Sequence, residues 1–361
     1  MIDLGFFSIS ILLAFFTAGM VLLSVLVNGL LLKFSSSLGS KNEENQVRWA
    51  LTSKPAFGGV SFYILFLISI VFYSIFFPQN ELLLNKQFLG FILAISLGFI
   101  MGLADDAYNT KPLIKFAVQF ICGFTFVLTD NVIHIFPWDT LNVFITFFWV
   151  VGLMNSINML DNMDAITSSV SIVICSGALM YMAFRQLHVN LDFIIILGVS
   201  STLIGFLYFN WNPSRIYMGD SGSQFLGIFL AGIGIKYFWN APGYYGDFSL
   251  ERQIIIALLM FVVPISDTAS VSVNRMLKGK SPFVGGRDHT THHLSYLGLS
   301  DRYVAVVMIL LSLVTMFTAI FVFNNVKQWN SYYTLFGIIL FIFIFIGLYT
   351  TTRLKKVKRE A

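Results

Sequence analysis

Length, composition and charge together exclude an ordinary soluble protein. Of the 361 residues, 57% are hydrophobic and 11% are charged, whereas soluble domains carry about 25% charged residues. The two cysteines, Cys122 and Cys175, both fall inside apolar runs, so we expect neither a disulfide framework nor a cysteine metal site. We expect the chain to lie in a lipid bilayer and to bind no nucleic acid.

Long apolar runs along the chain predict membrane-spanning helices. A hydrocarbon core of about 30 Å needs about 20 apolar residues per helix, and barrel strands would be shorter and alternating. The first run is too long for a signal peptide and predicts a retained span. We expect an all-α polytopic membrane protein with about eleven (ten to eleven) transmembrane helices, forming one catalytic domain over residues 1–361. In chain order the expected spans are Phe6–Leu32, Phe57–Phe77, Phe88–Leu103, Leu113–Leu128, Leu141–Ile157, Ser169–Phe184, Leu191–Phe209, Phe225–Phe238, Ile254–Val273, Tyr303–Phe323 and Tyr332–Leu348.

The distribution of basic residues predicts the orientation. The strongest basic cluster is the tail over residues 353–361, which should be cytoplasmic and anchor to anionic lipid. Counting spans back from the tail places 17 of the 22 lysines and arginines on the cytoplasmic side and four outside. We therefore expect the N-terminus outside and the C-terminus inside a bacterial inner (cytoplasmic) membrane, with the polar clusters described next on the cytoplasmic face.

Two acidic clusters follow the third and fifth expected spans. Asp105 and Asp106 are adjacent carboxylates, which repel unless a cation lies nearby, and Mg²⁺ accepts such ligands together with water and phosphate oxygens. The alternative is a hydrated helix end. Asn155, Asn158, Asp161 and Asp164 recur every three residues, so neighbouring side chains touch on a helix. They would wrap a polar ligand or a second face of the metal site, or simply cap a helix end.

Two further polar segments lie later in the chain. Asp220 stands in a Gly-Asp-Ser-Gly-Ser turn that opens a helix, which suits phosphate or Mg²⁺ but is also an ordinary N-cap. His289, His292 and His293 are three and four residues apart and would share a helix face. With Arg287 they favour a cationic pocket for a diphosphate, and a zinc site or a solvated loop are the alternatives.

Five motifs in this order resemble the polyprenyl-phosphate N-acetylhexosamine-1-phosphate transferase superfamily, of the glycosyltransferase family 4 type. They are Lys54-Pro-Ala-Phe-Gly-Gly, Asp105-Asp106, the Asn-x-x-Asn-x-x-Asp-x-x-Asp segment from Asn155, Phe209-Asn210-Trp with Met218-Gly-Asp-Ser-Gly-Ser, and Ser281-Pro-Phe with the histidine loop. The loop from Gly286 to His293 resembles the undecaprenyl-phosphate N-acetylglucosamine-1-phosphate transferase branch. The family has glycine where this chain has Asn162 and Ala165, close to the expected nucleotide.

The resemblance implies a role for each matching residue. Catalytic residues would be Asp105, Asp106 and Asp220, and the metal, Mg²⁺ with Mn²⁺ as a substitute, would be held by Asp220 and Asp161. Asp105 or Asp106 would position or deprotonate the lipid phosphate, and a covalent route stays open. Substrate would contact Lys54, Asn158, Asp161, Asp164, Asn210, Tyr217, Arg287, His289, His292 and His293, with Tyr217 near the uracil.

The resemblance also implies the reaction. The enzyme would transfer N-acetylhexosamine-1-phosphate from a UDP-sugar to undecaprenyl (polyprenyl) phosphate and release UMP, as the first membrane step of a cell-surface polysaccharide or O-antigen pathway. A homodimer is one expected assembly. The alternative within the superfamily is phospho-N-acetylmuramoyl-pentapeptide transferase, against which we weigh a charged Arg287–Asp288 pair suited to a compact hexosamine. The alternative from another class is a secondary transporter, whose carboxylates would lie near the midplane of repeated, broken helices.

Overall fold

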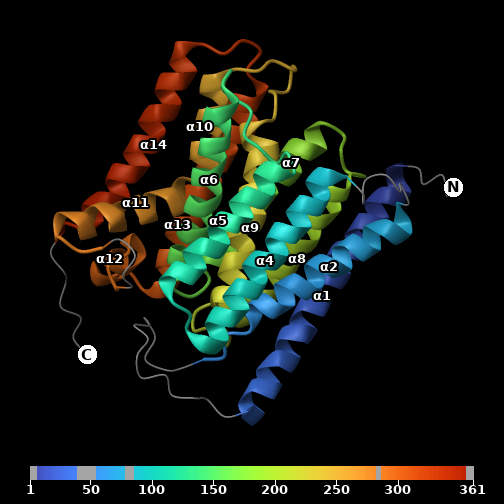
Figure 1. The fold of residues 1–361 in the computed structure, drawn as a ribbon, viewed down its shortest axis with the longest axis vertical. Helices are drawn as coiled ribbons and strands as arrows, with labels where there is room; N and C mark the ends of the chain where they lie inside the picture. The colour runs from blue at the N-terminus through green and yellow to red at the C-terminus, as the bar shows by residue number, and fades with distance from the viewer. Residues whose placement is uncertain (1–5, 39–53, 78–84, 282–285, 355–361) are drawn as a thin grey trace.

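The computed structural model describes residues 6–38, 54–77, 85–281 and 286–354, and this part of the chain folds into helices without a strand (Figure 1). The expected basic tail lies outside the described residues from 355 onward, as do residues 282–285 of the Ser281-Pro-Phe motif. The helices are α1 (Phe6–Leu38), α2 (Gly58–Phe76), α4 (Lys86–Tyr108), α5 (Pro112–Leu128), α6 (Asp139–Leu160), α7 (Ile166–Phe184), α8 (Leu191–Asn210), α9 (Gly219–Gly234), η1 (Ile235–Trp239), α10 (Leu250–Met260), α11 (Val262–Leu277), α12 (Thr290–Tyr296), α13 (Asp301–Phe317), η2 (Thr318–Val322), η3 (Phe323–Asn325) and α14 (Ser331–Thr351).

The all-α polytopic prediction is confirmed, and every expected span lies on a helix. Eight helices of the described residues are long and apolar enough to cross a membrane, and a bent helix pair would make a ninth. Helix α5 is apolar but shorter, and α9 has 16 residues before it continues into the π-helix η1. The count of eleven therefore stays a prediction. Figure 1 shows α1 starting and α14 ending at opposite ends of the bundle, as an odd number of crossings requires.

The ninth expected span, Ile254–Val273, is not one straight helix. Helices α10 and α11 meet at Phe261 with a bend of 77°. Pro264 explains the break, because proline lacks an N–H and its ring clashes with the carbonyl four residues earlier, here that of Met260, the last residue of α10. Helix α11 therefore runs sideways at the left of Figure 1, by the lower end of α14, and packs against α6 and α14.

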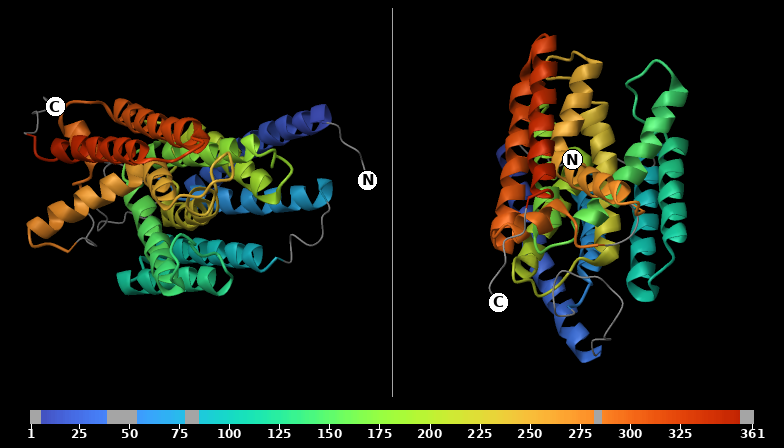
Figure 2. Two further views of the ribbon diagram at one scale, coloured as in Figure 1. Left: turned by 90° about the horizontal axis from the view of Figure 1, so that it is seen from above. Right: turned by 90° about the vertical axis from the view of Figure 1, so that its left-hand side faces the viewer.

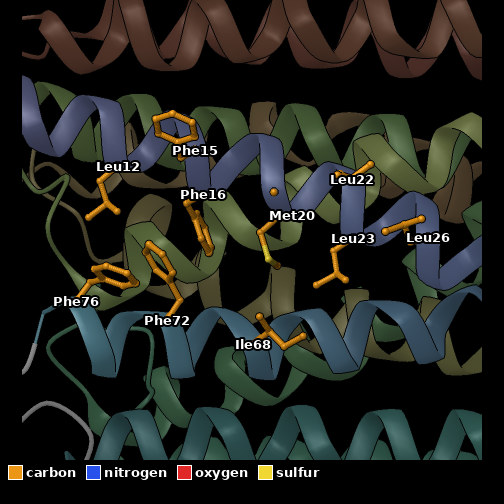
Figure 3. Close-up of a pocket in the computed structure, with 11 residues that line it drawn as sticks. Leu12, Phe15, Phe16, Met20, Leu22, Leu23, Leu26, Ile68, Phe72 and Phe76 are labelled. Atoms are coloured by element: carbon orange, nitrogen blue, oxygen red, sulfur yellow. The ribbon is translucent and has the colours of Figure 1, made fainter.

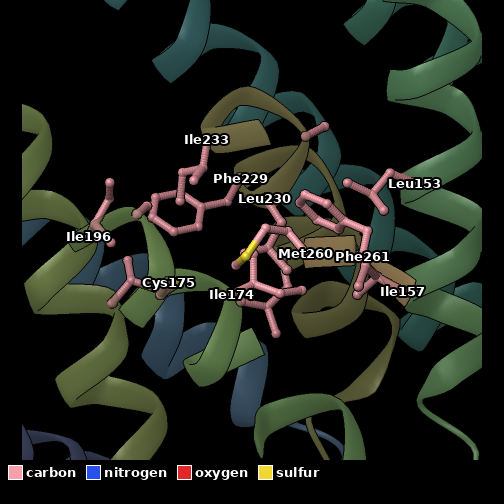
Figure 4. Packing of buried hydrophobic residues seen from close by; sticks show 14 of the residues in the cluster. Leu153, Ile157, Ile174, Cys175, Ile196, Phe229, Leu230, Ile233, Met260 and Phe261 are labelled. Atoms are coloured by element: carbon pink, nitrogen blue, oxygen red, sulfur yellow. The ribbon is translucent and has the colours of Figure 1, made fainter. Parts of the chain in front are cut away.

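Helix α9 forms the centre of the bundle, where it packs against α2, α4, α6 and α7. Figure 4 shows buried side chains from α6, α7, α8, α9 and the α10–α11 bend meeting around it, among them Leu153, Ile174, Phe229 and Met260. Figure 2 shows α4 and α5 on the opposite side of the bundle from α13 and α14. A Cβ atom at Gly102 of α4 would overlap the backbone of Asp220, so glycine there lets the end of α4 meet the start of α9.

An apolar groove of about 490 Å³ lies between α1 and α2, lined by residues such as Phe16, Met20, Ile68 and Phe72 (Figure 3). These residues belong to the second half of α2 and the part of α1 beside it. The first residues of α2 lie beside α9, since Gly59 donates a backbone hydrogen bond to the Met218 carbonyl. The groove is therefore at the other end of the bundle from the polar clusters.

Candidate active site

The start of α9 is held by Asp106. The two carboxylate oxygens of Asp106 accept hydrogen bonds from the backbone N–H groups of Asp220 (2.7 Å) and Ser221 (2.9 Å). Gly219, just before them, adopts φ +73°, and a Cβ atom on it would lie 2.7 Å from an Asp106 oxygen. Asp106 thus caps α9 from a neighbouring helix, as an acidic side chain at a helix N-terminus does.

Asp105 points to a different partner, Lys115 of α5. Its side chain is 4% exposed, one oxygen accepts from both the N–H (2.8 Å) and the hydroxyl (2.7 Å) of Thr110, and the other forms an ion pair with Lys115. The lysine Nζ also lies 3.5 Å from an oxygen of Asp220. The alternative of a hydrated helix end does not hold for Asp105, because the turn from α4 to α5 covers it.

Asp220 is partly exposed, with 35% of its side chain accessible to solvent. Asn158 at the end of α6 donates to its Oδ1 at 2.6 Å and to the Ser223 hydroxyl at 2.8 Å. Asn158 therefore aligns α6 with α9, and Asp220 keeps an exposed oxygen face between Asn158 and Lys115. A carboxylate in this setting can take a cation or a phosphate-bound metal.

Asp161 follows α6 and adds negative charge to the same place. Its burial, together with repulsion from Asp220, Asp106 and Asp164, raises the pKa of Asp161 to about 8. Crowded carboxylates have this effect when no cation balances them, and a divalent ion would reverse it. Among the described residues, no three His, Cys, Asp or Glu side chains are arranged to enclose a metal ion by themselves.

Asp164 and Asn210 are bound within the protein. Asp164 accepts from the side chain of Asn212 (3.0 Å) and from the N–H (2.9 Å) and hydroxyl (2.8 Å) of Ser214. Asn210 accepts from the N–H of Ala165 (3.1 Å) and donates to the Ile216 carbonyl (3.0 Å). Both side chains fasten the loop between α8 and α9 to the segment after α6.

A cation from the segment before α2 lies over an aromatic ring of that loop. Lys54 lies 5.2 Å from the ring centre of Tyr217 and donates to the Ser214 hydroxyl at 3.1 Å. The backbone N–H of Tyr217 donates to the Pro55 carbonyl at 2.8 Å, so the first motif runs directly beside the residues before Asp220. A flat ring flanked by a lysine suits a nucleobase next to phosphate.

The two positions where this chain departs from the family pattern are explained by the structure. Ala165 adopts φ +65°, the left-handed conformation that glycine takes at little cost. Asn162 donates to the Met159 carbonyl (2.8 Å) and accepts from the Thr291 hydroxyl of α12 (2.6 Å). Its side chain thereby joins the segment after α6 to the histidine helix.

The three histidines belong to α12 and the residue before it. His289 and His292 are buried with ring centres 5.3 Å apart, and His293 is partly exposed beside Tyr296. Burial and the nearby His289 lower the pKa of His292 to about 3, so the ring is neutral. His289 Nδ1 lies 2.8 Å from a carboxylate oxygen of Asp267, a residue of α11.

The charged pair at the start of this loop differs from the expected Arg287–Asp288 pair. Asp288 accepts from Nε (2.9 Å) and a terminal nitrogen (2.6 Å) of Arg275, and although partial burial opposes it, Arg275 lowers the pKa of Asp288. Arg287 is exposed, and its backbone carbonyl accepts from the Tyr296 hydroxyl at 3.2 Å. Asp288 therefore completes an ion pair within the protein.

Comparison with known proteins supports the family resemblance that the motifs indicate. The sequence model of glycosyl transferase family 4 matches residues 88–238, which contain all the carboxylates described above except Asp267 and Asp288. A probable undecaprenyl-phosphate N-acetylglucosaminyl 1-phosphate transferase of Bacillus subtilis is 29% identical over 67% of this chain and 68% of its own length. A phospho-N-acetylmuramoyl-pentapeptide-transferase of Staphylococcus saprophyticus is 28% identical over 79% of this chain and 89% of its own length.

Residues 88–238 thus carry the sequence pattern of glycosyl transferase family 4. The family consists of transferases that attach sugar phosphates to polyprenyl phosphate, so this protein is a glycosyl-1-phosphate transferase of the membrane. The enzyme prediction is confirmed over the transporter alternative. The two kinds of relative differ in their sugar donor, and the donor of this family 4 transferase is treated below.

Two residues of this family 4 transferase escaped the sequence analysis as site residues. Lys115 appears in the sequence analysis only among the basic residues that predict the orientation. It lies ten residues after Asp105, in the first turn of a helix that begins with Pro112, and this spacing indicates an ion pair. Asp267 falls within the ninth expected span, and a carboxylate inside an apolar run is itself a signal of function.

Proposed function

We propose that the enzyme transfers N-acetylhexosamine-1-phosphate from a UDP-sugar to undecaprenyl phosphate, at the cytoplasmic face of a bacterial inner membrane, with release of UMP. The observation that carries the proposal is the meeting of Asp220, Asp161 and Lys115 with the Lys54–Tyr217 pair at one end of the bundle. Both reactants are anions, so the enzyme must above all balance charge and align the two phosphates.

Mg²⁺ fits the residues that are present. Mg²⁺ takes one or two carboxylates and fills its remaining positions with water and substrate phosphate, so an incomplete protein ligand set is expected. Asp220 has a partly exposed carboxylate, and burial together with repulsion from Asp220, Asp106 and Asp164 raises the pKa of Asp161. Asp220, supported by Asp161, would hold the ion, which would neutralise the diphosphate of the donor.

The protein residues divide the remaining work. Lys115 lies between Asp105 and Asp220, where its charge is available to the phosphate of the lipid acceptor. Lys54 and Tyr217 would hold the nucleotide, and the histidines of α12 would contact the diphosphate from the other side of Asn162. Asp106 acts through the backbone of α9, and Asp164 and Asn210 through the loop they fasten.

UDP-N-acetylglucosamine, or a close N-acetylhexosamine relative, is the donor we propose. The Bacillus subtilis relative and the residue order of the histidine loop support it. The alternative donor, UDP-N-acetylmuramoyl-pentapeptide, is supported by the Staphylococcus saprophyticus relative, which covers more of the chain. The Arg275–Asp288 ion pair weakens the argument from a free charged pair, so a direct comparison of donors is needed.

The test is UMP release by the purified protein with undecaprenyl phosphate and each donor in turn. We expect release with UDP-N-acetylglucosamine, loss of activity in EDTA, and recovery with Mg²⁺ or Mn²⁺. The Asp220→Asn variant is the control for contaminating activity. Equal or faster release with the pentapeptide donor would reverse the donor assignment. Recovery with Zn²⁺ alone would favour a histidine-bound metal instead.

A further inference from the structure

Asp267 is a fully buried carboxylate in α11, six residues after the bend at Phe261. A buried carboxylate in a membrane protein is costly unless its oxygens are hydrogen-bonded, and such residues are usually functional. The bend turns α11 across the bundle, so Asp267 lies under the first residues of α12 and not beside the carboxylates of α4 and α9.

Within the described residues, the hydrogen-bond partners of Asp267 are His289 and Thr290, at the start of α12. One oxygen accepts from the N–H (2.8 Å) and the hydroxyl (2.7 Å) of Thr290, and the other lies 2.8 Å from Nδ1 of His289. The bonds from Thr290 attach the start of α12 to α11, and His289 is the one ring among the described residues that contacts this carboxylate. These two contacts can be removed separately.

We propose that Asp267 is a positioning residue, which holds the proton of His289 on Nδ1 and so reserves Nε2 for the phosphates of the substrate. A carboxylate that accepts from one imidazole nitrogen fixes both the tautomer and the ring orientation, which decides what the other nitrogen can do. The neighbouring ring of His292 is neutral, and Asp288 is occupied by Arg275. Asp267 is thus the carboxylate that orients a buried histidine of α12.

This inference rests on the proposed function, and it commits to a role that a helix anchor would not have. If Asp267 only anchored α12, any side chain that accepts a hydrogen bond from Thr290 could replace it. Asparagine has nearly the same shape as aspartate and keeps one carbonyl oxygen for Thr290, while it loses the charge and the second acceptor. The pair Asp267→Asn and Thr290→Val therefore separates orientation from anchoring.

The experiment is a double-mutant cycle on the full-length enzyme, with kcat, both KM values and the melting temperature measured for each variant. We expect Asp267→Asn to lower kcat about 10- to 100-fold, the range for lost orienting partners of histidine ligands, with KM nearly unchanged. The melting temperature should also fall, because a buried charge-assisted hydrogen bond is lost, so the loss of kcat is compared with that of Thr290→Val at a similar melting temperature. In a His289→Gln background, Asp267→Asn should have no further effect on kcat. Thr290→Val should keep kcat within about threefold, since the backbone N–H of Thr290 still donates to Asp267 and the contact with His289 is untouched, and Asp267→Glu should restore part of the rate lost in Asp267→Asn.

A second readout does not depend on turnover. In protein with ¹⁵N-labelled histidine, the resonance that disappears in His289→Gln should report a protonated Nδ1, and Asp267→Asn should change it. The inference is overturned if that resonance is unaffected, if Asp267→Asn lowers kcat equally in both backgrounds, or if Thr290→Val reproduces its effect. Should the wild-type enzyme release no UMP from any UDP-sugar, the proposed function fails, and the resonance still decides the role of Asp267.

Discussion

Replacing Asp106 with asparagine separates a residue that contacts substrate from one that builds the site. In the structure both carboxylate oxygens of Asp106 are bound to the first N–H groups of α9. The amide of asparagine keeps one acceptor but turns an NH₂ group toward the other N–H. One charge-assisted hydrogen bond is lost, and a donor at the start of α9 is left facing another donor.

The size of the effect follows from these contacts. A hydrogen bond to a charged group contributes about 1.5–3 kcal/mol, and a negative charge at a helix N-terminus adds about 0.3–2 kcal/mol. A combined loss of about 2–5 kcal/mol in holding Asp220 would lower turnover about 30- to 4,000-fold, at about 1.4 kcal/mol per factor of ten. The same loss should lower the melting temperature, because it weakens the contact between α4 and α9.

The assay compares Asp106→Asn with Asp220→Asn in one detergent, by UMP release and by melting temperature. Asp220→Asn should lose turnover by orders of magnitude without a lower melting temperature, since it removes a charge that Asp105, Asp106 and Asp161 repel. Asp106→Asn should lose both. A normal melting temperature with strongly reduced turnover in Asp106→Asn would refute the capping argument and return Asp106 to direct contact with the substrate.

Two further predictions concern α12. Thr291→Val removes the hydrogen bond to Asn162 and should lower the free energy of unfolding by about 1–3 kcal/mol, and with it the melting temperature. Thr291→Ser keeps the hydroxyl and should keep the stability. Equal losses in both variants would contradict a role for the hydroxyl. The pKa of His292 is about 3 in the folded protein against an ordinary value of 6.5. As the pH falls, the unfolded chain therefore binds the proton first. The free energy of unfolding should decrease by about 1.4 kcal/mol per pH unit below 6.5, or about 2 kcal/mol at pH 5. His292→Gln should lose less melting temperature than wild type between pH 7.5 and 5, and an unchanged decrease would contradict this.

Hydropathy predicts the positions of the helices well and their polar ends poorly. The third expected span ended at Leu103, whereas α4 continues to Tyr108 and ends at Asn109 in the left-handed conformation. The last turn of α4 holds Asp105 and Asp106, and a helix continues through polar residues as long as its backbone is hydrogen-bonded and its end is capped. The site lies in such polar final turns, so a search for apolar residues stops just before it.

The motifs predicted which residues gather, but not what each one contacts. Adjacent Asp105 and Asp106 looked equivalent in sequence, yet residues 100° apart on a helix face different neighbours, here Lys115 and the start of α9. The bend before Asp267 had a local signal in Pro264, but the continuous apolar run around it predicted a straight span. Side-chain partners depend on how helices pack, and no single motif determines that packing.

The charged site rests on a layer of amides one helical turn deeper in the bundle. Gln119 follows Lys115 by four residues and Gln224 follows Asp220 by four, so each pair shares a helix face. Gln119 donates to Gln224 at 3.2 Å and accepts from Asn155 at 2.8 Å, which ties α5, α9 and α6 together. Buried amides are stabilising only when they are satisfied in this way, and a satisfied network specifies one arrangement of its helices. The positions of Lys115 and Asp220 are therefore fixed by protein contacts below them, which allows the exposed side of the cluster to be left open for substrate.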